Sequence, residues 1–400
     1  MKHIKGGITA PRGFKAAGIS CGIKSSGKKD LALIVSNVIA EAAAVFTSNK
    51  VKAAPVKISK ERIESGKVRT IIVNSGNANC LRGAAGEKDT LAMIKKTAKS
   101  LNISPKHVLV ASTGSIAKPM PMRKILPGIV KLSKKISTKG GHSAAQAILT
   151  TDTRTKEIAL KIKLFGKDVV IGGMAKGAGM IAPNLATMLA FITTDANIKS
   201  GLLKKSLKQA VSKSFNMITV DKEQSTNDSV FVLANGLSGT KEIKDGTSEY
   251  KKFYEALEHV AIYLAKEIAR DGEGSTRLIE VRVAAAKTES DAEKVAKAVV
   301  GSALFKAAVF GEDPNFGRIV SAAGGSGADI NPDFINVYIG DNILVKKGVA
   351  VEFNEAQVKK YLKRKEIAVT VDLGQGSKNA VAWGCDLTYD YVRINARYHT

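Results

Sequence analysis

Apolar residues recur every three or four positions in three long segments, and this spacing predicts amphipathic helices. The segments are residues 87–101, a stretch that starts at Ser200, and residues 249–269. In the second, Ser200 is expected to cap a helix whose inward side carries Leu203, Leu207, Val211 and Phe215. In the third, the inward side is expected to carry Phe253, Leu257, Val260, Leu264 and Ile268. Two shorter helices are predicted at 291–300 and 354–363.

Short apolar runs between these segments predict β-strands. They occupy residues 31–39, 68–73, 188–192, 278–284, 334–339, 343–351 and 367–373. Helices and strands therefore alternate along the chain, which predicts a mixed α/β fold in which helices cover sheets that pair face to face. We find no internal repeat, low-complexity linker or domain hinge, and the length leaves both one large layered unit and two closely packed halves open.

Composition narrows the class of protein. The chain has 400 residues and 44% hydrophobic content, which is typical of a globular protein with a sizeable core. The first residues lack the apolar segment of a signal peptide, and the apolar stretch 31–46 is interrupted by polar residues. We expect a cytoplasmic protein without a membrane partner. The three cysteines form no C-x-x-C pair and the five histidines form no H-x-x-x-H pair, so neither a disulfide framework nor a metal site is predicted.

The net charge of +26, from 62 Lys and Arg against 36 Asp and Glu, raises nucleic-acid binding as an alternative. The lysines lie mostly on predicted exposed helix faces, however, and only 5% of the residues are aromatic. We therefore expect no nucleic-acid partner. A positive field that speeds the encounter with carboxylate substrates stays open as a weaker interpretation.

One loop carries candidate chemistry. Residues 176–189 contain two glycines and a proline, and Thr187 in this segment stands directly before the apolar run 188–192. A threonine hydroxyl needs a base beside it to act as a nucleophile. Cleavage of the Ala186–Thr187 bond would supply one, because the new α-amine has a reference pKa of roughly 7.7 to 8.0. The plain alternative is that Thr187 only opens a β-strand.

Acyl transfer at Thr187 also needs donors for a tetrahedral oxyanion, and Thr113 with Gly114 is the candidate pair. An amino-acid ligand further needs a cation and an anion, which Lys176 and Glu273 supply. The alternatives are ordinary turns at Gly114 and Glu273 and a solvated Lys176. The glycines near Lys176 do not complete a dinucleotide fingerprint, and no phosphate-binding P-loop motif occurs, so no cofactor is predicted.

The segment 173–196 resembles the self-cleaving segment of the ornithine acetyltransferase family, also called glutamate N-acetyltransferases. Further blocks similar to this family follow one another in order along the chain. They are residues 9–14, 44–49, 73–79, 111–114, 150–153, 225–228, 271–274, 311–315 and 383–396.

The resemblance implies an αββα-type sandwich, similar in layering to N-terminal-nucleophile hydrolases but with different connectivity. It also implies autocatalytic cleavage into an alpha chain, residues 1–186, and a beta chain, residues 187–400, which stay intertwined. Two alpha and two beta chains would form a heterotetramer.

The implied activity belongs to arginine biosynthesis. Thr187 would take the acetyl group from N2-acetylornithine and pass it to glutamate in a ping-pong reaction, with Thr113 and Gly114 as the oxyanion hole. Acetyl-CoA as an additional donor stays open. The family's substrate contacts fall on Thr150, Lys176, Thr187, Glu273, Asn395 and Thr400. Thr151 and Thr153 are alternatives to Thr150, and hydrolysis by a self-processing aminopeptidase of similar fold is the alternative activity.

Overall fold

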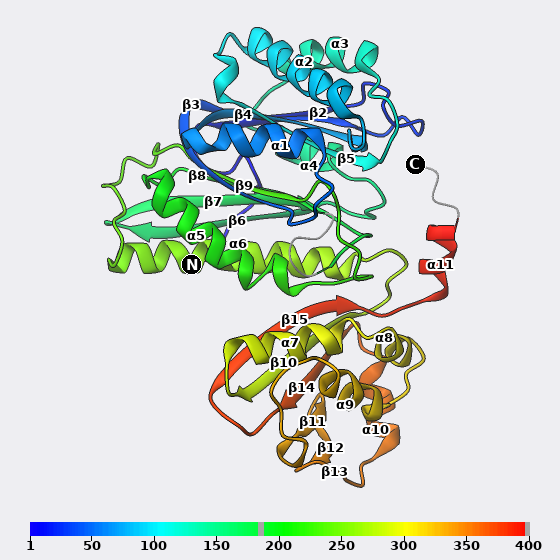
Figure 1. Ribbon diagram of the computed structural model, residues 1–400. Coiled ribbons are helices and arrows are strands. Elements are labelled where there is room, and N and C mark those ends of the chain that lie inside the picture. Colours follow the sequence, from blue (N-terminus) through cyan, green and yellow to red (C-terminus); the bar gives the residue numbers. More distant parts are fainter. Residues whose placement is uncertain (183–187, 397–400) are drawn as a thin grey trace.

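Two β-sheets organise the computed structural model, which describes residues 1–182 and 188–396; in these residues one sheet has nine strands and the other six (Figure 1). The larger sheet runs in the order β1-β6-β7-β8-β9-β3-β4-β5, and β2 also pairs with β3. Its strands are β1 (Lys2–His3), β2 (Phe14–Ile19), β3 (Leu31–Phe46), β4 (Lys67–Asn77), β5 (Val108–Ser115), β6 (Lys156–Leu164), β7 (Lys167–Lys176), β8 (Leu189–Thr194) and β9 (Ser229–Ala234).

Strand β3 belongs to two layers of this sheet. Its first part pairs with β2 and β4, whereas residues 41–46 pair with β9. Residues 37–39 between the two parts are exposed, and the register with β4 shifts there. The strand is therefore longer than the predicted 31–39, because pairing with β9 overrides the low strand propensity of its alanines.

The two layers produced by this bend lie face to face. Phe14, Ile34 and Val73 of the first layer share one core cluster with Phe191 and Phe231 of the second. The last two rings stack with centroids 5.5 Å apart. Burial of such large apolar side chains is the main force that holds the layers together.

Helices cover the outer faces of both layers (Figure 1). Helices α2 and α3 pack on the first layer, and α5 and α6 pack on the second. The mixed α/β layered fold predicted from the sequence is confirmed. The helices of this lobe are α1 (Ala54–Arg62), α2 (Gly83–Leu101), α3 (Met122–Ser133), α4 (Gly141–Ala147), α5 (Ser200–Ser212) and α6 (Ser248–Arg270), with short 3-10 turns at Ile63–Ser65, Pro105–His107 and Phe215–Met217.

Helix α6 confirms its predicted pattern, since the five inward residues of the stripe are fully buried. Helix α5 corrects two details. Ser200 is the first residue of the helix and Lys199 is the capping position, and the Ser200 N–H donates to Glu41 Oε2 at 3.1 Å. Phe215 is buried as expected, but it lies beyond the end of the helix. A carboxylate from β3 thus replaces the expected serine cap.

The C-terminal strands form the second sheet, in the order β13-β12-β11-β14-β10-β15. They do not pair face to face with the first sheet, and this corrects the expectation that the predicted C-terminal strands belong to sheets paired in that way (Figure 1). The elements are β10 (Leu278–Ala286), α7 (Glu289–Val300), α8 (Ala303–Phe310), α9 (Phe316–Gly324), a 3-10 turn (Pro332–Phe334), β11 (Asn336–Ile339), β12 (Asn342–Lys346), β13 (Val349–Ala350), α10 (Glu355–Leu362), β14 (Glu366–Asp372), β15 (Lys378–Cys385) and α11 (Tyr389–Ala396).

The predicted strand 343–351 is a hairpin of β12 and β13. Lys347 and Gly348, with φ of 47° and 74°, form the two-residue turn between them. Positive φ at both central positions is what such a hairpin turn requires. The part of the chain built on the first sheet contacts the part built on the second sheet where the Thr219 N–H donates to the Trp383 carbonyl at 3.0 Å.

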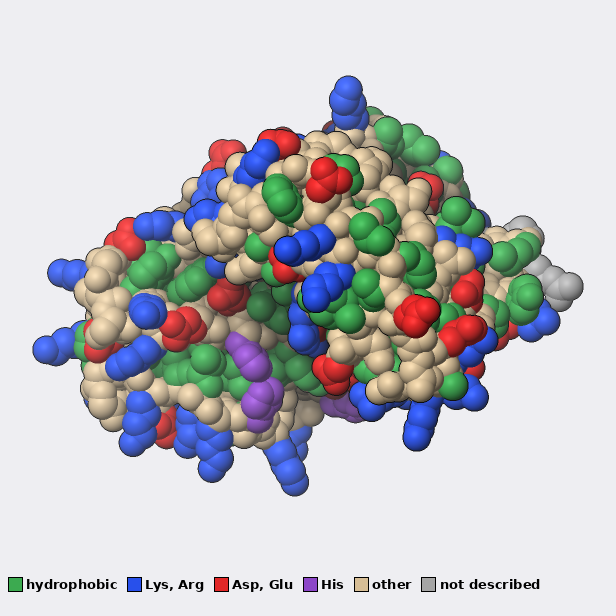
Figure 2. Space-filling view, turned by 90° about the horizontal axis from the view of Figure 1, so that it is seen from below, with side chains coloured by type: hydrophobic (Ala, Val, Ile, Leu, Met, Phe, Trp, Pro, Cys, Tyr) green, Lys and Arg blue, Asp and Glu red, His purple; other side chains and the backbone are tan. Residues whose placement is uncertain are grey.

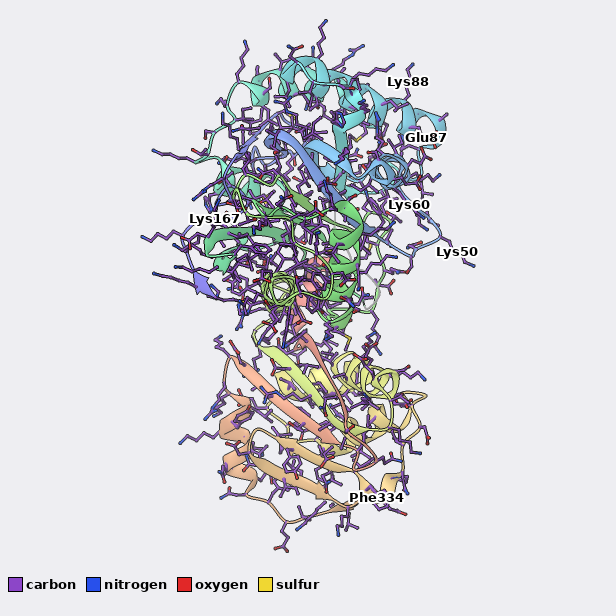
Figure 3. All side chains as sticks on the ribbon, turned by 90° about the vertical axis from the view of Figure 1, so that its left-hand side faces the viewer. Lys50, Lys60, Glu87, Lys88, Lys167 and Phe334 are labelled. Carbon is purple, nitrogen blue, oxygen red and sulfur yellow. The ribbon has the colours of Figure 1, made fainter. Side chains whose placement is uncertain are left out.

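Basic side chains are spread over the surface and interspersed with acidic ones on the face shown in Figure 2. Lys50, Lys60, Lys88 and Lys167 lie at the periphery (Figure 3) and are exposed. Lys156, Lys176 and Lys306 are buried instead. Within residues 1–182 and 188–396 no helix is long and apolar enough to cross a bilayer, and no group of acidic, cysteine and histidine side chains is arranged to hold a metal.

Candidate active site

The ends of several strands of the larger sheet meet around one cavity of about 270 Å³. Strands β5 and β7 end there, and the loop before β9 closes one side. The lining residues are Ala78, Thr113, Gly114, Ser115, Ile116, Thr150, Thr151, Lys176, Gly179, Met180, Ser225, Thr226, Asn227, Glu273 and Asn395. All candidate site residues within the described ranges are therefore gathered in one place. Ala186, Thr187 and Thr400 lie outside the described residues.

Thr113 and Gly114 reach the cavity at the end of β5, which pairs in parallel with β4. Gly114 lies opposite Gly76 and has a φ of +131°. A Cβ at this position would lie 2.3 Å from the carbonyl carbon of Gly76. Glycine is therefore required for both conformation and close approach, and Gly114 is part of a strand pair, not of an ordinary turn.

Lys176, the last residue of β7, is only 2% exposed, so the solvated interpretation of this residue is wrong. Its Nζ lies 3.8 Å from Asp152 Oδ2. Burial lowers the pKa of the Lys176 ammonium, and the charge of Asp152 offsets this only in part. The cavity thus contains a desolvated cation, which binds an anion more strongly than a solvated lysine does.

Glu273 and Asn395 come from the C-terminal half of the chain. The Glu273 N–H donates to the Ala178 carbonyl at 2.8 Å, and its carboxylate packs on Gly179, where a Cβ would lie 2.3 Å from Oε2. Asn395 Nδ2, on α11, donates to the same Oε2 at 2.9 Å. The carboxylate is therefore fixed from two sides next to the loop that follows Lys176.

The three neighbouring threonines are separated by the structure. Thr150 and Thr151 line the cavity, whereas the Thr153 hydroxyl donates to Asp271. The Thr150 N–H donates to Asp152 Oδ2 at 2.9 Å, which fixes the backbone at this position. Thr153 is thereby removed as an alternative to Thr150.

Several buried ionisable residues at the site received no role from the sequence. Asp152 contacts Lys156 and Lys176, and Asp228 Oδ1 accepts the Met188 N–H at 2.9 Å. Burial raises the pKa of Asp228 well above its ordinary value. The sequence signal that could have found such residues is their place next to a buried strand, since Lys156 begins the apolar strand β6 and Asp228 immediately precedes β9. A charged residue beside a buried strand needs a partner or a function.

Comparison with known proteins decides the family. The sequence signature of the ArgJ family matches residues 15–400. The chain belongs to the ArgJ family. The resemblance seen in the ordered sequence blocks is thereby confirmed.

Relatives named arginine biosynthesis bifunctional protein ArgJ match over their full length. The one from Symbiobacterium thermophilum is 50% identical over 402 residues, with 100% of both chains covered. The one from Caldanaerobacter subterraneus subsp. tengcongensis is 49% identical over 404 residues, also with 100% of both covered. A crystal structure of ArgJ from Bacillus halodurans is 45% identical, with a TM-score of 0.51, and the match covers 52% of this chain and 98% of that one.

Proposed function

We propose that this ArgJ family member is a glutamate N-acetyltransferase of arginine biosynthesis, which moves the acetyl group of N2-acetylornithine to glutamate. The full-length relatives carry arginine biosynthesis in their names. One observation carries the assignment of substrates. A single cavity combines an oxyanion-type residue pair, Thr113 and Gly114, with one buried cation and one acidic side chain.

The charges of the cavity fit an acetylated diamino acid. Of the described lining residues, Lys176 and Glu273 are the charged ones. We assign the α-carboxylate of acetylornithine to Lys176 and its side-chain ammonium to Glu273, since this pairing opposes unlike charges at both ends. Thr150 and Asn395 supply further polar contacts, and Thr400 completes the proposed set.

Thr187 is the proposed nucleophile, made reactive by cleavage after Ala186. Its Oγ attacks the acetyl carbonyl carbon while its α-amine takes the hydroxyl proton, and the amine returns that proton to ornithine N2 as the C–N bond breaks. Glutamate then attacks the acetyl ester through its amine, and Thr187 recovers its proton. The aligned Bacillus halodurans chain is about half as long as this one, which supports a chain cut near its middle.

The proposal extends to assembly and donors. Chains 1–186 and 187–400 would remain together in a cytoplasmic heterotetramer of two alpha and two beta chains. Acetyl-CoA is a candidate second donor, consistent with the word bifunctional in the names of the relatives. No cofactor is assigned.

The deciding experiment incubates the purified protein with N2-acetylornithine and glutamate and follows N-acetylglutamate by mass spectrometry. We expect stoichiometric formation of ornithine and N-acetylglutamate, and a parallel reaction tests acetyl-CoA as the donor. Hydrolysis of unacetylated dipeptides without acetyl transfer would assign the aminopeptidase activity instead.

Replacement of Glu273 by Gln is expected to change the two substrates in opposite directions. The variant loses the negative charge that attracts the ammonium of acetylornithine, so KM for this donor should rise about tenfold. The same charge repels the side-chain carboxylate of glutamate, so KM for the acceptor should fall. Steady-state kinetics with each substrate varied in turn measures both values.

Glu280→Gln is the matched control for this variant. Glu280 is a partly buried carboxylate on β10 that bonds to Lys266 and Trp383 away from the cavity. The Glu280→Gln variant should be less stable than the wild type, with both KM values unchanged. Equal shifts of both KM values in Glu273→Gln would contradict the assigned contact.

A further inference from the structure

A buried ion cluster lies next to the cavity and consists of Asp152, Lys156 and Asp271. Lys156 Nζ lies 2.8 Å from Asp152 Oδ1 and 2.6 Å from Asp271 Oδ2. The side chains of Lys156 and Asp152 are fully buried, and that of Asp271 is 4% exposed. Buried charges are tolerated when they are paired in this way, but the pairing itself is weak grounds for a role in stability.

Asp152 also contacts three groups that belong to the cavity wall or its immediate neighbour. Its Oδ1 accepts the Gly177 N–H at 2.6 Å, and its Oδ2 accepts the Thr150 N–H at 2.9 Å. The same Oδ2 lies 3.8 Å from Lys176 Nζ. One carboxylate therefore connects the loop that carries Thr150 with the end of β7 that carries Lys176.

Asp271 extends this connection to the anionic side of the cavity. It accepts both the N–H and the hydroxyl of Thr153, and it stands two residues before Glu273 in the chain. The cluster therefore joins the segments of Thr150, Lys176 and Glu273.

The electrostatic situation of Lys176 depends on Asp152. Burial lowers the pKa of Lys176, and Asp152 is the strongest opposing influence. Burial alone would raise the pKa of Asp152, but the ammonium groups of Lys176 and Lys156 outweigh it, and the pKa lies below the ordinary range. The charged groups that act on Lys176 or are acted on by it are Asp152, Lys156, Asp228, Glu273 and Lys24.

We propose that Asp152 is a positioning residue for substrate binding, which keeps Lys176 charged toward the cavity and fixes Thr150 beside it. This inference rests on the proposed function, because it assigns the carboxylate of the amino-acid substrate to Lys176. The role goes beyond structural support, since it makes the charge of a substrate-binding group depend on a residue that does not touch the substrate.

Replacement of Asp152 by Asn tests the proposal through the pH dependence of KM. Without the carboxylate, the pKa of Lys176 falls further, so Lys176 loses its proton at a lower pH. The rise of KM for N2-acetylornithine with increasing pH should therefore begin at a lower pH than in the wild type. At a pH between the pKa of Lys176 in the variant and its pKa in the wild type, KM of the variant should exceed that of the wild type about tenfold or more. The reason is that each pH unit above a pKa lowers the protonated fraction about tenfold. Acidification should restore KM, and kcat should change less than KM.

Asp195→Asn is the matched control. Asp195 is another buried carboxylate, directly after β8, and it accepts the backbone N–H groups of Arg12 and Val170 away from the cavity. This variant should melt at a lower temperature but keep the wild-type pH profile of KM. A purely structural role of Asp152 predicts the same behaviour for Asp152→Asn, and that result would overturn the proposal.

Asp271→Asn decides the matter if Asp152→Asn does not fold. Without Asp271, Lys156 is paired with Asp152 alone and competes with Lys176 for the negative charge of Asp152. The pH at which KM begins to rise should therefore shift in the same direction as in Asp152→Asn, but by less. An unshifted profile would reject the inference. Absence of acetyl transfer by the wild-type enzyme would instead reject the proposed function, so the two failures are distinguishable.

Discussion

Thr187→Ala is expected to remain a single chain of 400 residues and to lose acetyl transfer by at least about four orders of magnitude. The alanine lacks the Oγ that is proposed to cut the chain and to carry the acetyl group. Because the chain is not cut, the α-amine that would serve as the base is never released. One substitution thus removes both nucleophile and base, which is why its effect should exceed that of any binding residue.

Two variants isolate this effect. Thr187→Ser keeps a hydroxyl and should still be cut, with reduced activity. Thr193→Ala removes a buried hydroxyl from β8, where it donates to the Ile8 carbonyl at 2.7 Å, and should be cut and active. Intact-mass spectrometry and the acetyl exchange assay read out the three variants. Two fragments from Thr187→Ala, with a beta chain beginning at residue 187, would contradict cleavage by this threonine.

The parts of the fold that the sequence predicted are those governed by local periodicity. The apolar stripe of α6 is buried as expected, the predicted strand 278–284 lies within β10, and the predicted strand 367–373 lies within β14 except for its last residue. These elements keep their pattern because each has one side against a core. Strand pairing could not be predicted in this way, since the paired residues of β10 and β14, such as Leu278 and Glu366, are 88 positions apart in the sequence. The separate second sheet was missed for this reason.

The residues of the candidate site likewise fall into those that the sequence predicts and those that only the folded chain shows. Thr113, Lys176 and Glu273 were found because ordered sequence blocks mark them, and the structure places them in one cavity. Asp152 stands in such a block too, but its importance arises from Lys156 and Asp271, and Asp271 is 119 positions away in the sequence. A buried ion pair between distant residues leaves no periodic signal. Only the folded chain shows that these charges meet.

Gly114→Ala is expected to lower kcat about 10²- to 10³-fold, the usual cost of losing one oxyanion donor, with little change in KM. An added Cβ would lie 2.3 Å from the Gly76 carbonyl carbon and 2.4 Å from the Asn77 nitrogen, both of them backbone atoms. Neither can rotate away, so the end of β5 must move relative to β4. The φ of +131° adds strain for any residue with a side chain. Thr113, the preceding residue, would move with it.

The proposed cleavage reaction passes through an oxyanion as well, so Gly114→Ala should also accumulate uncut chain if both reactions use the same donors. Gly201→Ala in α5 provides the matched control, because nothing lies within 4 Å of its added Cβ. That control should gain up to about 1 kcal/mol of stability, since alanine favours a helix over glycine, and keep wild-type kinetics. Normal kcat with complete cleavage in Gly114→Ala would remove Gly114 from the oxyanion hole. Slow cleavage with normal kcat would instead show that chain cleavage and acetyl transfer use different oxyanion donors. The geometry at Gly114 would then serve the cleavage reaction only.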